Sequence, residues 1–263
     1  MKEVEILKSI AEAGKNSTID IVKRRYTSKL SPELNNLYRE MQEKGFVIVP
    51  DFMTAQQCEE IKSWMDTVIT TNPKIWKDSV ESDNRIFFSN TASPQIDNFY
   101  TNKNIIDVLS VYEKTRNYQG FTLANKLVYK DDNAGSGGGW HRDFVKRKQT
   151  KALLYLSDVT EKNGSFQFIS KTHIFKNILK FQKEFGFRYN QFRFTNEEIE
   201  RVVTKYPELL QTITGKAGTL ILVDTRGIHR GKPVMEGTRY ALTNYYWFGG
   251  SIPAHIKKLN PFK

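Results

Sequence analysis

The chain of 263 residues carries 40 lysines and arginines against 29 aspartates and glutamates, which gives a formal net charge of +11. Its hydrophobic content of 39% and aromatic content of 13% predict a folded domain with a sizeable core and exclude an intrinsically disordered chain. The longest aliphatic run, 220–223, is far too short to span a bilayer, and the first residues lack the apolar segment of a signal peptide, so we expect a cytoplasmic protein.

The first 44 residues predict a helical extension packed on the core, because apolar residues recur along them at helical spacing. Ser31 and Pro32 predict the start of its last helix. Serine can cap the free N–H groups of a first turn, and proline at the first helical position loses no intrahelical bond. Gly45 then predicts the end of this helix.

The core is predicted to begin with a strand over 46–49, which Pro50 stops. Thr54 and Gln57 have the spacing of a capping box, and the helix that follows places Cys58 on its apolar face. We therefore expect this single cysteine to be a buried residue and not a catalytic thiol. A lone cysteine also excludes an internal disulfide, which suits a reducing compartment.

From residue 121 onward, short β-rich runs separated by turn residues predict an antiparallel sandwich or barrel. The runs are 121–129, 151–156, 165–169, 219–223 and 240–248. The segment 174–214 interrupts them and contains a capped helix start at Thr195 and Glu198. An insertion of this kind between strands is a candidate lid or substrate-selecting element, although its many aromatic residues could also simply pack together.

The histidines are His141, His173, His229 and His255. His141 and Asp143 are two residues apart, so in an extended strand both side chains project to one face and could bind one metal ion. His229 follows the run 219–223 and could add a third ligand, which completes the 2-His-1-carboxylate arrangement of non-haem Fe(II) oxygenases. The alternative is that these are ordinary hydrogen-bonded residues at strand ends.

Two neighbouring features bear on this site. Three consecutive glycines, 137–139, precede His141, and glycine permits close backbone approach beside a metal but is equally normal in a flexible loop. Arg239 opens the last β-rich run, ten residues after His229. If that run pairs beside the strand leading to His229, the guanidinium enters the same cavity and can bind a carboxylate through two parallel hydrogen bonds.

Over roughly residues 45–250 the chain resembles the phytanoyl-CoA dioxygenase family of Fe(II)/2-oxoglutarate oxygenases. The matching segments follow the family's order along the chain: 45–52, Asn125 with Lys126, 140–143, 156–159, Asn163 with Gly164, 169–173, and 218–223 leading to His229 and Arg239. The family often has Gly-Ser where this chain has Lys171 and Thr172, so the turn there can differ.

The resemblance implies a double-stranded β-helix (jelly-roll, cupin-like) core over 45–250, with flanking helices and a C-terminal tail over 251–263. It implies that His141, Asp143 and His229 bind Fe(II), and that His173 is a turn residue instead of a ligand.

For the co-substrate, the resemblance implies that Arg239 binds the distal carboxylate of 2-oxoglutarate. Asn125 and Lys126 correspond to weaker co-substrate contacts, and Tyr155 could offer its hydroxyl to the same carboxylate. The expected reaction consumes O2 and 2-oxoglutarate, releases succinate and CO2, and hydroxylates an aliphatic C–H. Desaturation and epimerisation stay open, whereas halogenation is disfavoured because Asp143 is present.

Basic residues flank both halves of the expected metal site: Arg142, Lys146, Arg147, Lys148 and Lys151 in one cluster, and Arg226, Arg230, Lys232 and Arg239 in the other. If both clusters converge near the cavity mouth, they favour an anionic substrate, either a small molecule or a carrier-linked or sugar-linked one. The alternative is that they are solvated surface charges. A non-catalytic binding protein for nucleic acid or a metabolite is the competing function class, but no zinc-finger, basic-helix or RNA-binding signature is present.

Overall fold

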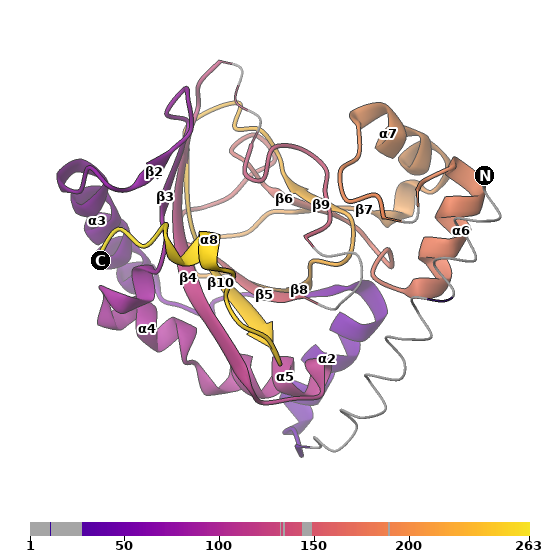
Figure 1. Cartoon of the computed structure of the whole chain (residues 1–263), viewed down its shortest axis with the longest axis horizontal. Helices are drawn as coiled ribbons and strands as arrows, with labels where there is room; N and C mark the ends of the chain where they lie inside the picture. Colours follow the sequence, from indigo (N-terminus) through magenta and orange to yellow (C-terminus); the bar gives the residue numbers. More distant parts are fainter. Residues whose placement is uncertain (1–10, 12–27, 132, 134, 144–148, 189) are drawn as a thin grey trace.

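Two antiparallel sheets form the core of the protein, with helices along the outer face of the larger one (Figure 1). The computed structural model describes residues 11, 28–131, 133, 135–143, 149–188 and 190–263. The helical stripes expected before residue 28, and Lys146, Arg147, Lys148 and Tyr189, lie outside these residues. The predicted class, mainly β with flanking helices and a jelly-roll core, is confirmed.

The larger sheet has seven strands, all joined antiparallel. In spatial order they are β1 (Phe46–Val49), β8 (Leu220–Asp224), β5 (Thr150–Tyr155), β10 (Thr238–Phe248), β4 (Tyr118–Val128), β3 (Asp83–Ile86) and β2 (Trp76–Lys77). Five predicted runs are confirmed as the strands β1, β4, β5, β8 and β10. The predicted and observed ends differ by at most three residues. Sequence patterning did not predict the short strands β2 and β3.

The smaller sheet has the order β7 (Leu210–Ile213), β6 (Phe166–Ile169) and β9 (His229–Gly231). The backbone at His141 pairs with that of His229 through two hydrogen bonds, N–H to carbonyl in both directions, of 2.8 and 2.9 Å. On its other side His141 bridges to Arg193 of the insertion. This pairing places two of the expected metal ligands on adjacent strands.

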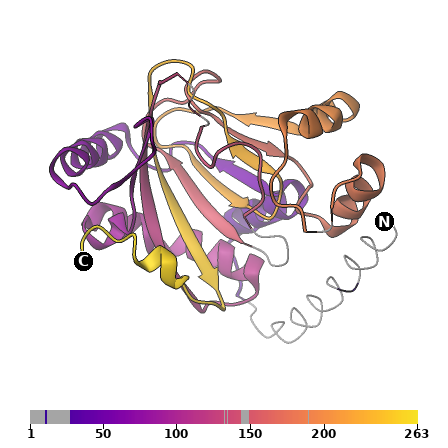
Figure 2. The ribbon, with the colours of Figure 1, turned by 45° about the horizontal axis from the view of Figure 1, so that its top comes forward.

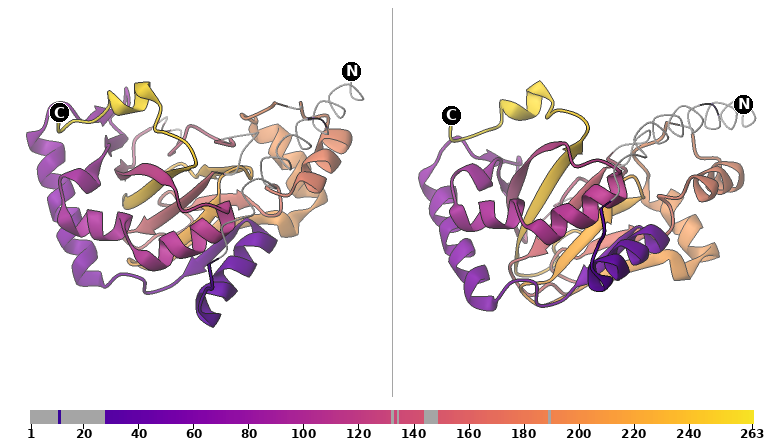
Figure 3. Two further views of the ribbon diagram at one scale, coloured as in Figure 1. Left: turned by 60° about the horizontal axis from the view of Figure 1, so that its bottom comes forward. Right: turned by 90° about the horizontal axis from the view of Figure 1, so that it is seen from below.

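The helices fall into two groups (Figure 3). Those on the outer face of the larger sheet are α2 (Pro32–Lys44), α3 (Ala55–Thr71), α4 (Pro94–Tyr100) and α5 (Lys103–Glu113). Those of the insertion are α6 (Phe175–Phe185) and α7 (Asn196–Lys205), which lie beside the smaller sheet at the opposite end of the molecule from α3 (Figure 2). The 3₁₀ turns η1 (Ser89–Thr91) and η2 (Pro207–Leu209) and the short helix α8 (Ala254–Lys257) complete the chain.

The predicted caps are present. The Ser31 hydroxyl accepts a hydrogen bond from the Leu34 N–H at 3.3 Å, and Gly45 ends α2 with a left-handed φ of 93°. Thr54 and Thr195 each make a full capping box at the start of α3 and α7. Within the described chain, no helix is both long and apolar enough to cross a membrane.

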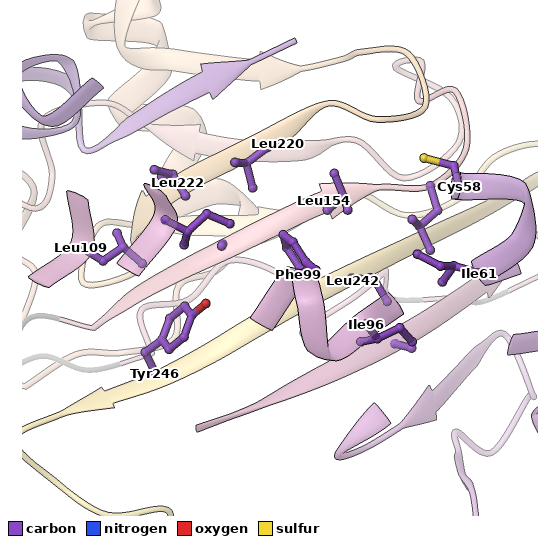
Figure 4. Close-up of a cluster of buried hydrophobic side chains, with 14 of the residues drawn as sticks. Cys58, Ile61, Ile96, Phe99, Leu109, Leu154, Leu220, Leu222, Leu242 and Tyr246 are labelled. Atoms are coloured by element: carbon purple, nitrogen blue, oxygen red, sulfur yellow. The ribbon is translucent and has the colours of Figure 1, made fainter. Parts of the chain in front are cut away.

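Strand alternation divides the larger sheet into two chemically different faces. In β8, Leu220 and Leu222 face the helices, whereas Ile221 and Val223 face the smaller sheet. Figure 4 shows the helix-side core, where leucines from three strands meet residues of α3, α4 and α5. Cys58 lies in this layer at 1% exposure, and burial raises the pKa of its thiol to about 11, so it is not a nucleophile.

The insertion packs through its own aromatic residues. Phe181, Phe187 and Phe194 are buried in one cluster with Trp140, while Phe192 is 58% exposed. Burial of each such ring stabilises the fold by about 1.5–3 kcal/mol. We therefore assign these buried aromatic residues to packing.

Candidate metal centre

Three side chains from distant parts of the chain converge between the two sheets. His141 and Asp143 lie on the segment that pairs with β9, and His229 begins β9. The His141 Nε2 and Asp143 Oδ1 atoms are 3.7 Å apart, and the His229 Nε2 and Asp143 Oδ2 atoms are 3.6 Å apart. One donor atom from each of the three residues lies within 4.8 Å of the others, which is close enough to bind a single ion.

The hydrogen bonds of the two imidazoles fix which nitrogen faces the ion. His141 Nδ1 lies 2.8 Å from the Gly139 carbonyl, and His229 Nδ1 lies 2.9 Å from the Gly227 carbonyl. A carbonyl only accepts, so each Nδ1 carries the proton and each Nε2 presents a lone pair. Asp143 Oδ2 is buried and pairs with the Lys151 ammonium at 2.6 Å. Two nitrogen lone pairs and a carboxylate fit a divalent transition metal.

The ionisation states also suit a metal. Burial, together with the neighbouring His141, lowers the pKa of His229 to about 3, and burial lowers the pKa of His141 as well. Burial alone would raise the pKa of Asp143, but the Lys151 ammonium and the two imidazoles hold it well below its usual value. At neutral pH the site therefore offers two neutral imidazoles and one carboxylate.

The glycine run beside His141 has a steric reason. Gly137, Gly138 and Gly139 have φ values of 87°, 65° and 87°, a region that disfavours side chains. A Cβ atom on Gly137 would lie 2.4 Å from Cε1 of the His141 ring. The run therefore lets the backbone approach the imidazole and fold over it.

Arg239 lies at the other end of the same cavity and is 3% exposed. Its Nη1 donates to the Gly164 carbonyl, and its Nη2 donates to Asn125 Oδ1 at 3.0 Å. The Asn125 amide in turn donates to Asp83, so this asparagine orients the guanidinium. The Arg239 Nε is buried without a hydrogen-bond partner among the described residues, which leaves a donor for an incoming anion.

The cavity that joins the triad to Arg239 has a volume of about 240 Å³. Among the residues that the structure describes, its charged lining consists of four cations, Arg85, Lys151, Arg193 and Arg239, and one acid, Asp143. Sequence reasoning missed Arg85 and Arg193. Arg85 lies on β3, whose four residues carry no apolar alternation, and Arg193 reaches the cavity because the insertion pairs with His141. Only a three-dimensional pairing reveals either residue.

Two expected co-substrate contacts lie elsewhere. Lys126 follows Asn125 on β4 and so points to the opposite face, where its Nζ lies 2.7 Å from Asp66 Oδ1. The Tyr155 hydroxyl is already engaged, since it donates to the Ile213 carbonyl at 2.9 Å and accepts from the Phe166 N–H at 3.0 Å. Neither residue lines the cavity.

The other histidines lie away from the triad. His173 Nε2 lies 3.0 Å from the Gln42 carbonyl beside α2, and His255 is exposed on α8. The turn before His173 has a left-handed φ of 64° at Lys171, so the lysine occupies a conformation that favours glycine.

Of the described members of the two basic clusters, which were expected to converge near the cavity mouth, Lys151 and Arg239 line the cavity and the others do not. Arg142 lies between the two ligands of an extended segment, so its side chain turns away, is buried, and donates through Nε to the Arg226 carbonyl at 2.6 Å. Arg226 pairs with Asp224 at 3.2 Å, and the Arg230 guanidinium stacks 4.4 Å from the Trp140 ring. Lys232 does not line the cavity either.

Comparison with known proteins identifies the family to which the chain is similar. The profile of the family described as phytanoyl-CoA dioxygenase (PhyH) matches residues 41–239, most of the chain. No curated protein matches it.

Several solved structures share the fold at about 15% identity. The epimerase SnoN, in complex with Fe3+, α-ketoglutarate and nogalamycin RO, has 15% identity and a TM-score of 0.63 over 86% of this chain and 89% of its own. HygX from Streptomyces hygroscopicus, with nickel, 2-oxoglutarate and hygromycin B bound, has 15% identity and a TM-score of 0.55 over 83% and 87%. The α-ketoglutarate-dependent carbocyclase SnoK from nogalamycin biosynthesis has 15% identity and a TM-score of 0.57 over 88% and 91%.

Proposed function

The chain belongs to the phytanoyl-CoA dioxygenase family, and from this premise we propose that it is an Fe(II)- and 2-oxoglutarate-dependent dioxygenase. One observation carries the proposal. A 2-His-1-carboxylate cluster and a buried arginine with an unsatisfied donor line the same cavity, so one dicarboxylate could reach both. SnoN and HygX, which share the fold, are described with iron or nickel and with the same oxoacid.

In this proposal His141, Asp143 and His229 hold Fe(II). Bound iron would supply the oxidising power, with O2 and 2-oxoglutarate consumed and succinate and CO2 released. The protein contributes the geometry: the carbonyls of Gly139 and Gly227 hold the protonated Nδ1 atoms, so both Nε2 atoms stay aimed at the ion.

Arg239 binds the distal carboxylate of 2-oxoglutarate, and Asn125 orients its guanidinium. Arg85 also lines the cavity from β3, in register with Asn125, but its guanidinium is paired with Asp83 at 2.5 Å. Arg239 is therefore the guanidinium that favours an anionic ligand over a neutral one of the same size.

The primary substrate is an anionic small molecule or a carrier-linked or sugar-linked one, oxidised at an aliphatic C–H by hydroxylation. The support is the described part of the cavity lining, which includes four cations and one carboxylate. The structures of SnoN and HygX contain nogalamycin RO and hygromycin B, which are small molecules. Asp143 retains the carboxylate ligand, which favours oxygen transfer over halogenation.

An anaerobic titration with Fe(II) and then 2-oxoglutarate tests this proposal. The wild type is expected to bind one equivalent of each and, in air, to release succinate. His141→Ala is expected to lose both properties, because one of the three ligands is gone. His255→Ala is the matched control, since that histidine is exposed and lies outside the cavity. A wild type that binds neither ligand contradicts the proposal, and one that binds both without succinate release under a wide substrate screen favours a metabolite sensor.

A further inference from the structure

Lys151 is a cavity cation in direct contact with the candidate metal centre. Its Nζ lies 2.6 Å from Asp143 Oδ2, and its side chain is 9% exposed. The same ammonium lies 4.0 Å from the centroid of the Tyr245 ring, on the neighbouring strand β10. Tyr245 is itself stacked on Phe121, with ring centroids 5.2 Å apart. The ammonium is therefore held by two rigid, adjacent strands and not by a loop.

The oxygen that Lys151 contacts is the one that faces His229. Asp143 Oδ2 lies 3.6 Å from His229 Nε2, so the oxygen that pairs with Lys151 is also the one nearest the second imidazole of the candidate ligand set. A carboxylate oxygen binds a transition metal at about 2.1 Å. An ion on Oδ2 would therefore lie at most about 5 Å from the Lys151 ammonium, and the two cations would share one carboxylate.

Charge sharing weakens the pair between Lys151 and Asp143 as soon as a metal ion binds. A buried ammonium needs a compensating anion, because an unpaired buried charge is costly. The cavity beside Lys151 is where such an anion can approach, since both Lys151 and Asp143 line it. In the proposed function Arg239 binds one carboxylate of the co-substrate through its buried Nε, which leaves the other carboxylate for the metal end.

We propose that Lys151 binds the metal-end carboxylate of 2-oxoglutarate when an ion on Asp143 shares the negative charge of that aspartate. This inference rests on the proposed function. It makes Lys151 a second anchor for the co-substrate. No bond is made or broken at Lys151 itself; only the partner of its ammonium changes.

Binding measurements on Lys151→Met test the proposal, because the affinities for metal ion and for co-substrate are not expected to fall together. Under anaerobic conditions, Co(II) is titrated first, and oxalate, which resembles only the metal end of the co-substrate, is titrated second. The variant is expected to bind Co(II) as tightly as the wild type or more tightly, because a competing cation is removed. It is expected to bind oxalate and 2-oxoglutarate about 10- to 100-fold more weakly, because a charge-assisted contact is lost.

The matched control is Lys126→Met, which removes another ion-paired lysine next to a tyrosine ring on the same sheet but outside the cavity. It is expected to leave all three affinities unchanged. Lys151→Gln serves as a second variant, and circular dichroism checks that each protein is folded. Oxalate affinity equal to that of the wild type in both Lys151 variants overturns the proposal. So does a loss of Co(II) affinity, which would make Lys151 a support for Asp143. A wild type that binds Co(II) but not 2-oxoglutarate contradicts the proposed function itself.

Discussion

A lysine, an aspartate and a tyrosine meet on each face of the larger sheet. On the cavity face, Lys151 pairs with Asp143 over the Tyr245 ring. On the helix-covered face, Lys126 pairs with Asp66 at 2.7 Å, and its ammonium lies 5.0 Å from the centroid of the Tyr240 ring. The Tyr240 hydroxyl also donates to Asp66 at 2.8 Å.

What separates the two clusters is their surroundings. The Lys126 and Asp66 side chains are 24% and 47% exposed, and no imidazole is part of their contacts. The Lys151 and Asp143 side chains are 9% and 19% exposed and face two imidazoles whose lone pairs point at the same carboxylate. The outer carboxylate is open to solvent, whereas the inner one is largely enclosed and lies beside both imidazoles. A Lys–Asp–Tyr cluster becomes a candidate site only where solvent is excluded and further ligands converge.

The largest expected difference is in metal binding. Asp143→Asn should weaken Co(II) binding by more than about 100-fold, because even a residue that only supports a ligand contributes roughly 10- to 100-fold. Asp66→Asn should leave it unchanged. Isothermal titration of both variants under anaerobic conditions measures the contrast, and equal affinities would remove Asp143 from the proposed ligand set.

Substitution of a buried arginine in the cavity should weaken 2-oxoglutarate binding, whereas substitution of an exposed arginine outside it should not. Arg239→Lys is expected to weaken 2-oxoglutarate binding about 10- to 100-fold, because lysine cannot replace the fork that also donates to Gly164 and Asn125. The control is Arg116→Lys, whose guanidinium is 52% exposed and pairs with Asp107 outside the cavity. Affinity that falls equally in both variants would contradict a dedicated role for Arg239.

The sequence predicted those parts of the site that rest on local pattern. The two-residue spacing of His141 and Asp143, the glycine run and the strand leading to His229 are all visible in one dimension, and the structure brings them together. Five strands of the larger sheet, β1, β4, β5, β8 and β10, were predictable for the same reason, because β-rich runs and turn residues are local signals.

The remaining residues depend on register, which the sequence does not show. Shifting a side chain by one position along a strand moves it to the other face, and this is why Lys126 and Arg142 leave the cavity although their neighbours Asn125, His141 and Asp143 do not. Arg85 and Lys151 enter it because β3 and β5 pair in register with β4 and β10. Proximity in sequence to a ligand was therefore a poor guide to charge in the cavity.

Stability of the metal-free protein gives a further, smaller contrast between the two clusters. Lys151→Met should lower the free energy of unfolding by about 3 kcal/mol, because it leaves a buried carboxylate unpaired. Lys126→Met should lower it by less than about 1 kcal/mol, because solvent screens the outer pair. Urea unfolding of both variants measures the difference. Saturating Co(II) should reduce the loss in Lys151→Met, since the metal then compensates Asp143.

The smallest expected effect is the pH dependence of the free energy of unfolding of the metal-free protein. It arises from the imidazoles on the cavity face. Burial lowers the pKa of His141, and lowers that of His229 to about 3, whereas both titrate near 6.5 in the unfolded chain. Between these values the unfolded state binds more protons than the folded state, so stability must fall as the pH drops below about 6.5. We expect a loss on the order of 1–2 kcal/mol from His229 between pH 7 and pH 5. In His229→Phe the dependence should flatten over this range, while in Lys126→Met it should match the wild type. An unchanged slope in His229→Phe would mean that this imidazole is charged in the folded protein, which is incompatible with an Nε2 lone pair held ready for a metal ion.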